Sequence, residues 1–354
     1  MTNKKKYFAC ANTCIGFVNR FDSVIQSQNL EKIYIIKEDF NSKFINEAAE
    51  IAEEKKYSVE YFSSPFELSH LNGIIIKELK TAIISNELSN YMLDMPPVIE
   101  IIIDFSKFFD ELKILDRKQE IFELVQKRNE SLNSAYKFLR AANELSESIA
   151  GLSKKYINHE KLDSFIERLI NKNIPVNEKS LHENTEFKFI NTVSSSGELE
   201  LDTLEAESKK IFCISNVNFL GWYCTKKIAG KFVNISKVIC PDTLNPDNIR
   251  AIFLKNSKIL FIVKDEIFNS KYDFINFINM ERFISADFKK ENKQKLKFIQ
   301  KCYKSIMGEV AKYIAETDSI NTSIEFIYNS SIDMSINKNE KDKYIAKFIK
   351  KIIE

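Results

Sequence analysis

Glycine is scarce in this chain, where it accounts for 7 of 354 residues. Loops that wrap phosphate groups depend on glycine, because it adopts positive φ angles and lets the backbone approach the ligand closely. The usual share of glycine in proteins is about 7%. The scarcity therefore argues against a conventional phosphate-binding loop.

Long apolar runs and a strong charge of one sign are also missing. No run approaches the roughly 18–20 apolar residues that cross a membrane. Three lysines near the N-terminus are not followed by the apolar stretch of a secretion signal. The net charge is +2, which implies no broadly basic surface for nucleic acid. We expect a cytoplasmic protein that binds neither membrane nor nucleic acid.

The six cysteines and three histidines show no arrangement typical of a metal or catalytic site. No C-x-x-C pair occurs, and no histidine lies near a cysteine, so the spacing rules for zinc sites and disulfide frameworks are not met. The histidines have no triad-like surroundings in the sequence. We interpret the cysteines as small buried side chains in a reducing compartment.

One stretch, residues 32–46 (KIYIIKEDFNSKFIN), has the layout of a phosphate-binding loop. Four apolar residues at 33–36 predict a buried strand, a polar turn follows, and a helix begins near Phe44. The turn has no glycine and carries Glu38 and Asp39. Each acid would repel a phosphate by about 1 kcal/mol at 4 Å in water.

The pattern then repeats along the chain. Residues 32–37 (KIYIIK) are echoed by 210–215 (KIFCIS), an offset of 210 − 32 = 178, and 73–84 meets 251–262 at the same offset. Strands alternate with helices in each half, which favours a three-layer α/β sheet. Each half also contains a long helical stretch, about 105–150 and about 289–315, with apolar residues near heptad spacing in the first. The sequence predicts two tandem α/β domains, 1–180 and 181–354, each with an appended helical arm.

Three segments together resemble a family of uncharacterised bacterial tandem P-loop proteins, usually described as ATPases or nucleotide kinases. The first is FACANTCIGF at 8–17, which is similar to the family's F-x-G-x-N-T-x-x-G-F. The others are AYKFLRAA at 135–142, and IEFIY at 324–328 followed by IDM at 332–334. The resemblance covers nearly the whole chain and implies a tandem P-loop NTPase-like fold.

The family pattern implies a Walker A loop of the type G-G-P-G-T-G-K-S in each half, and this chain departs from it twice. The first loop keeps a lysine, Lys43, but has Phe44 in place of the hydroxyl residue. The second keeps Gly221 but has Trp222 and Tyr223 in place of Lys and Ser. We interpret six residues as vestigial phosphate-loop positions: Asn41, Ser42, Lys43, Asn216, Asn218 and Gly221.

Other polar signatures implied by the resemblance are altered as well. A D-G-T-A-P-H-like segment corresponds to 85–90 and 264–269, and a His-Asp pair corresponds to 146–147 and 321–322. The apolar run 259–264 ends in Asp265 and Glu266, similar to a Walker B strand, which makes these two acids the candidate metal ligands. Apolar runs that end in acids are also common in proteins without a metal.

The leading hypothesis is a non-hydrolysing pseudo-NTPase with a binding or regulatory role. It implies no cofactor, no catalytic residue and a protein partner, either an intact paralogue or a second copy of the chain. The alternative is an atypical ATP-binding protein, nucleotide kinase or ATPase that uses Mg²⁺ with Lys43 and Asp265. A third hypothesis assigns partner binding to the helical arms.

Overall fold

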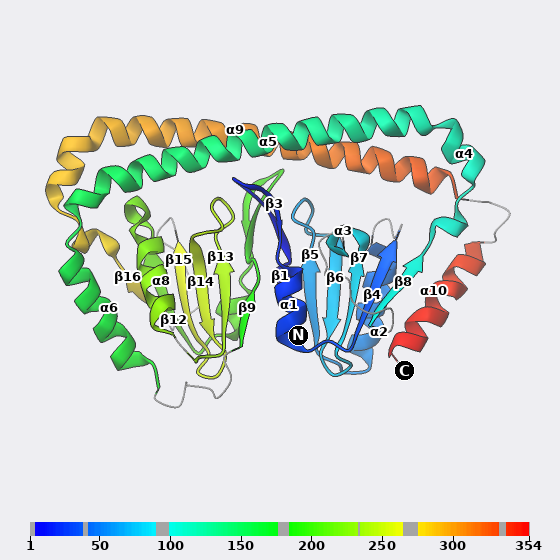
Figure 1. The fold of residues 1–354 in the computed structure, drawn as a ribbon, viewed down its shortest axis with the longest axis horizontal. Helices are drawn as coiled ribbons and strands as arrows, with labels where there is room; N and C mark the ends of the chain where they lie inside the picture. Colours follow the sequence, from blue (N-terminus) through cyan, green and yellow to red (C-terminus); the bar gives the residue numbers. More distant parts are fainter. Residues whose placement is uncertain are drawn as a thin grey trace.

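Two six-stranded sheets stand side by side beneath a pair of long helices (Figure 1). The computed structural model describes residues 4–37, 42–89, 99–175, 184–232, 234–264, 275–332 and 338–353. The mixed α/β class and the two-sheet layout agree with the sequence-based prediction. Among these residues, no helix has both the length and the apolar content required to cross a membrane.

The first sheet has the strand order β1-β5-β6-β7-β4-β8. Parallel pairing joins β1 to β5, and β4 to both β7 and β8, whereas β6 runs antiparallel to β5 and β7. The four inner strands are buried along most of their length, whereas the edge strands β1 and β8 are partly exposed. The bounds of the strands are β1 Lys5–Phe8, β4 Lys32–Lys37, β5 Val59–Ser63, β6 Leu71–Ile76, β7 Thr81–Ser85 and β8 Glu100–Asp104.

The second sheet repeats this order strand for strand as β9-β13-β14-β15-β12-β16. The pattern of parallel and antiparallel neighbours is also the same. The repeat seen in the sequence is therefore a repeat of topology. The bounds are β9 Thr185–Phe187, β12 Lys210–Ser215, β13 Lys237–Pro241, β14 Ile249–Leu254, β15 Ile259–Lys264 and β16 Ile275–Ile278.

Each half also carries a hairpin between its first strand and its first helix. The hairpins are β2 (Cys10–Thr13) with β3 (Gly16–Asn19), and β10 (Asn191–Ser194) with β11 (Gly197–Glu200). Gly16 and Gly197 have φ of 109° and 100°, so glycine supplies the turn in both. The sequence pattern did not predict strands in these segments.

The helices on the outer faces of the sheets are exchanged between the halves. The first sheet is covered by α2 (Lys43–Glu54) and by the C-terminal α10 (Lys338–Ile353), which contributes Ile345, Ile349, Ile352 and Ile353. The second sheet is covered by α8 (Leu220–Lys231) and by α6 (His159–Asn173) from the first half of the chain. The packing thus crosses the predicted boundary at residues 180 and 181. The shorter helices are α1 Phe21–Gln28, α3 Asn86–Ser89, α4 Glu111–Asp116 and α7 Thr203–Glu207.

The helical arms are α5 (Lys118–Ser153) and α9 (Ala286–Ser330), which pack against each other above both sheets (Figure 1). Bridges from Phe109 to Ile332 and from Ile157 to Ile284 show that the two helices run antiparallel. The predicted bounds 105–150 and 289–315 were wrong at their ends, because α9 continues to Ser330 and α5 begins only after α4. Each arm was expected to belong to its own half, but the two form one structure.

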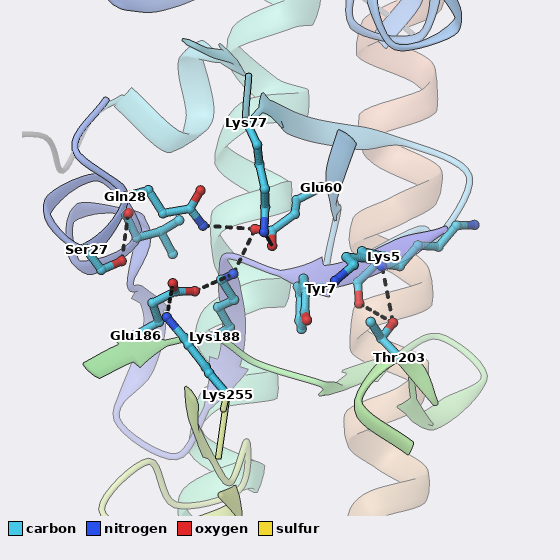
Figure 2. Close-up of polar contacts among 12 residues, drawn as sticks. Lys5, Tyr7, Ser27, Gln28, Glu60, Lys77, Glu186, Lys188, Thr203 and Lys255 are labelled. Carbon is cyan, nitrogen blue, oxygen red and sulfur yellow. Dashed lines mark hydrogen bonds and ion pairs between the residues drawn. The ribbon is translucent and has the colours of Figure 1, made fainter. Parts of the chain in front are cut away.

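A shared apolar core and a buried ionic cluster join the halves. One core cluster contains residues of both sheets together with α1 and α7. Beside it, the Lys188 Nζ lies 2.8 Å from Glu60 and 2.7 Å from Glu186 (Figure 2). Lys77 pairs with Glu60 at 2.7 Å, and Lys255 pairs with Glu186. Because Glu60 and Glu186 come from different sheets, the cluster links the two halves.

Candidate functional site

The first strand–loop–helix junction lies between β4 and α2. Ser42 precedes the helix with a left-handed φ of 52°, the conformation that glycine usually takes at such a position. Its hydroxyl donates a hydrogen bond to the Leu71 carbonyl at 2.7 Å. Asn41 lies outside the described residues. Ser42 thus serves the packing of the loop against β6.

Lys43 is the first residue of α2 and faces the C-terminal helix. Its Nζ lies 2.6 Å from Asp342 Oδ1 on α10 and 3.8 Å from Glu47 Oε1. The side chains of Lys43 and Asp342 are each 46% exposed, so this ion pair is screened by solvent. The amino group of Lys43 is thus engaged by a carboxylate of the C-terminal helix.

The second junction lies between β12 and α8 and is built without glycine in its turn. Asn216 follows the strand and is buried. Asn218 and Phe219 have consecutive left-handed φ angles of 50° and 63°. Such angles are uncommon outside glycine, particularly for a bulky residue. Non-glycine residues in left-handed conformations therefore make this tight strand-to-helix turn.

Gly221 lies within the first turn of α8, because the helix already begins at Leu220. A Cβ on Gly221 would lie 2.8 Å from Val263 Cγ1 and 3.1 Å from Asn216 Cα. Glycine is required here so that the helix can approach β15 closely. Its role in this structure is helix–strand packing.

Trp222 fills the space beside this junction. It is 7% exposed and its ring stacks on Phe219 with centroids 4.9 Å apart. Its indole Nε1 is buried and has no hydrogen-bond partner among the described residues. A stacked aromatic pair therefore occupies the space beside this strand-to-helix turn.

A cavity of about 370 Å³ opens between the first junction and the arms, and we call it the first cavity. Its floor includes Ser42 and the ends of the strands of the first sheet. Its roof comes from both arms, with Arg128 on α5 and Asp318 on α9. Its remaining charged or titratable lining consists of Glu67, His70, Glu325 and Tyr328.

A second cavity of about 410 Å³ occupies the corresponding place in the other half. It touches Asn216, Asn218 and Trp222 on the floor, and α5 and α9 on the roof. On its wall, the Arg250 guanidinium lies 3.3 to 3.6 Å from carboxylate oxygens of Glu198, Glu200 and Asp242. Three acids therefore already surround this buried cation.

A second buried cation, Lys264, lies beside this wall and shares Glu200 with Arg250. Lys264 Nζ lies 2.7 Å from Glu200 and 3.0 Å from Glu205. Burial opposes the charge of Lys264, but the two carboxylates outweigh it and raise the pKa of this lysine. Burial raises the pKa of Glu205, with Lys264 acting in the opposite direction.

The two cavities are related by the internal repeat but differ in chemistry. The N-caps Asp110 and Ser285 precede the arm of each half, an offset of 285 − 110 = 175. At this offset Arg128 corresponds to Tyr303, which lines the second cavity, and Asp318 corresponds to Asn143. At these two positions the first cavity has charged groups where the second half has neutral ones, although Lys304 on α9 also lines the second cavity.

Several positions implied by the family resemblance do meet at these cavities. Ser146 lines the second cavity, and Asn321 and Thr322 line the first. Ser85 and Asn86, at the start of the other altered segment, also line the first cavity. Asp265 and Glu266 lie outside the described residues. Within the part of the chain that is described, no group of three or more His, Cys, Asp or Glu side chains could hold a metal ion.

Sequence reasoning missed the charged residues on the cavity roof. Arg128 follows Ile121 and Val125 at helical spacing, so it occupies the next position of an apolar stripe. A charged residue at a position of this apolar stripe was the signal in the sequence that could have identified Arg128. Comparisons of the chain with family models, curated proteins and solved structures found no match.

Proposed function

We propose that the protein is a degenerate, non-hydrolysing relative of tandem P-loop NTPases that acts by binding. The observation that carries this proposal is the environment of Lys43, whose amino group pairs with Asp342 instead of lining the cavity over its loop. Phosphoryl transfer requires a cation and a metal-binding hydroxyl aimed at the phosphates. The buried Phe44 stands where that hydroxyl would be.

The second half supports the same proposal by a different route. Phe219 and Trp222 form a stacked aromatic pair beside the loop. The buried Arg250 is held among three carboxylates, so little of its charge is available to an anion. Each half would have lost phosphate binding through its own set of substitutions.

The proposal predicts that Mg-ATP does not stabilise the protein. A ligand present at 100 times its Kd would raise the free energy of unfolding by about 2.7 kcal/mol. We expect no change in Tm with millimolar ATP or GTP, with or without Mg²⁺, and no heat of binding in titration calorimetry. Phosphate release measured over hours should equal that of a protein-free blank.

Turnover that disappears in Lys43→Ala would contradict the proposal and support the alternative of an atypical ATPase or kinase. The matched control is Lys55→Ala, which removes an exposed lysine at the other end of α2. The observation in favour of the alternative is the second cavity, whose 410 Å³ falls within the range of about 300–1,000 Å³ for small-molecule sites. Asp265→Asn tests the candidate metal ligand in the same assay.

We further propose that the arms present a surface to a protein partner, either a second copy or an intact paralogue. Phe122 on α5 and Phe326 on α9 are 66% and 68% exposed. They lie between two cross-arm contacts, those of Arg117 with Ser330 and of Lys127 with Glu316, so they stand at one level of the helix pair. Exposed aromatic side chains are frequent anchors of protein interfaces.

This partner proposal predicts concentration-dependent assembly that depends on those two side chains. Sedimentation velocity of the chain alone, and of its mixture with an intact tandem P-loop paralogue, should show a complex that Phe122→Ser or Phe326→Ser weakens at least about tenfold. Phe298→Ser is the control, because Phe298 is also 68% exposed but lies near the opposite end of the arms. Monomers in both experiments would contradict the proposal.

A further inference from the structure

The roof of the first cavity contains a cation and an anion that do not pair with each other. Arg128 and Asp318 both line the cavity, one from each arm. The adjacent Lys127 and Glu316 form an ion pair across the antiparallel arms at 3.4 Å, so Arg128 and Asp318 lie within about one helical turn of the same level. Even so, no ion pair within 4.0 Å joins these two charges or either of them to another described residue.

The arginine retains unused hydrogen-bonding capacity. Its Nε is buried and has no partner among the described residues, and its only hydrogen bond there is a 3.5 Å contact from Nη2 to Asn129. A guanidinium has five N–H donors in a fixed fork that matches a carboxylate. The Nη1 amino group makes no hydrogen bond to a described residue either, so the guanidinium can donate to an acceptor in the cavity.

The aspartate lies in surroundings that favour an incoming cation. Burial raises the pKa of Asp318, the charge of Glu67 raises it further, and His70 acts in the opposite direction. Glu67 is itself 3.4 Å from His70 Nδ1. A positively charged group beside Asp318 would offset both the burial and the repulsion from Glu67.

The rest of the lining suits a small, mostly polar molecule with an aliphatic part. Hydroxyl and amide side chains form part of the floor and roof, and apolar side chains complete the wall, among them Phe66, Ile121, Val125 and Tyr328. The volume of about 370 Å³ lies near the lower end of the range for small-molecule sites, about 300–1,000 Å³. The second cavity lacks this charge pair, because Tyr303 and Asn143 hold the corresponding positions.

We propose that the first cavity binds a free α-amino acid, with its carboxylate on the Arg128 guanidinium and its ammonium on Asp318. Both of its charges then meet an opposite charge that has no other ion-pair partner among the described residues. This inference rests on the proposed function, because a nucleotide seated on the first loop would compete for the same space.

The experiment is a thermal-shift screen of the full-length protein against each of the twenty common amino acids at millimolar concentration. Any amino acid that raises Tm is then titrated by calorimetry. We expect a single site, and a loss of affinity of at least about tenfold when the ligand is N-acetylated or converted to its amide, because each blocked form lacks one charge. These two ligand tests use the unmodified protein.

Two variants and two matched controls locate the site. Arg128→Gln and Asp318→Asn should each weaken binding at least about tenfold. Lys127→Gln and Glu316→Gln, which remove like charges from the neighbouring cross-arm pair, should leave it within about twofold. Circular dichroism confirms that each variant is folded.

Absence of any Tm increase, or binding that survives either blocked ligand or either variant, would overturn the inference. A parallel titration with Mg-ATP separates the two proposals. Binding of ATP refutes the proposed loss of nucleotide binding, whereas no response to ATP or to any amino acid refutes the amino-acid site alone.

Discussion

Lys188 is a fully buried cation whose two partners come from different halves of the molecule. Its side chain is 1% exposed, and those of Glu60 and Glu186 are 4% and 9% exposed. Its Nζ also lies 4.6 Å from the centre of the Tyr7 ring, which favours a positive charge. Removing one partner from such a cluster leaves the others charged and without compensation.

We therefore predict that Lys188→Met lowers the free energy of unfolding by about 3–5 kcal/mol at pH 7. The measurement is urea unfolding followed by circular dichroism. The control is Lys5→Met, which breaks an ion pair with Glu207 at 2.6 Å between the same two halves. Its lysine side chain is 39% exposed, so we expect a change of at most about 1 kcal/mol. Equal effects of both variants would contradict the importance of the buried cluster.

The cluster also predicts a specific dependence on pH. Burial alone would raise the pKa of Glu60, but the charges of Lys188 and Lys77 outweigh it and hold this pKa well below its usual range. Burial would also raise the pKa of Glu186, but the charges of Lys188 and Lys255 outweigh it and lower this pKa. These carboxylates stabilise the fold above their unfolded pKa of about 4.3, and this contribution is lost as pH falls toward the folded pKa.

In Lys188→Met, the buried Glu60 and Glu186 keep only Lys77 and Lys255 as opposite charges. Protonation of these carboxylates removes the negative charge that is no longer balanced. The difference in unfolding free energy between the parent protein and the variant should therefore narrow when urea unfolding is repeated from pH 7 down to pH 4. A difference that stays constant across this interval would show that the carboxylates are not responsible.

The helices α6 and α10 are separated in the sequence from the strands that they cover. Each is amphipathic and short, and each packs on the sheet of the other half of the chain. Ile166 is 2% exposed on α6 and Ile349 is fully buried on α10. Most of the stability of such helices comes from packing of the apolar face.

We predict that Ile349→Ala and Ile166→Ala each cost about 2–5 kcal/mol, the usual range for removing a buried isoleucine side chain. Hydrogen exchange measured on peptides should show that Ile349→Ala loosens β4 and β7 of the first sheet. Ile166→Ala should instead loosen β12 and β15 of the second. Lys347→Ala, on the exposed side of α10, is the control and should change neither sheet.

The reverse pattern, with Ile349→Ala loosening the second sheet first, would contradict the exchange of helices. Uniform loss of protection in both sheets would instead show that the shared core makes the two halves unfold together.

The buried strands and long helices could be predicted because their signals are local. The runs at 33–36 and 211–214 are apolar without interruption, and the arms have apolar residues at helical spacing. The hairpins escaped prediction because each strand has only four residues and carries polar side chains. The pairing of α5 with α9 was not predictable from periodicity, since an apolar stripe does not specify which helix packs against it.

At the scale of the molecule, the internal repeat was the most informative part of the sequence. It predicted that the strand order of one half would return in the other, and the sheets have this arrangement. The candidate site was predictable at its loops, where Ser42 and Asn218 do line the cavities, and at a few other positions such as Ser146 and Asn321. Arg128 and Asp318 could not be paired in advance, because 190 residues separate them in the sequence, 318 − 128 = 190.

The crossing of the chain between the halves also has a consequence for biosynthesis. The last strand of the first sheet, β8, ends at Asp104, whereas α10, which covers this sheet, begins at Lys338, a separation of 338 − 104 = 234 residues. At a ribosomal rate of about 5–20 residues per second, the nascent first sheet would wait roughly 10–50 s for that helix. Throughout this interval the apolar surface reserved for α10 is open to solvent and to chaperones. The native packing of the first sheet therefore becomes attainable only after α10 has been synthesised.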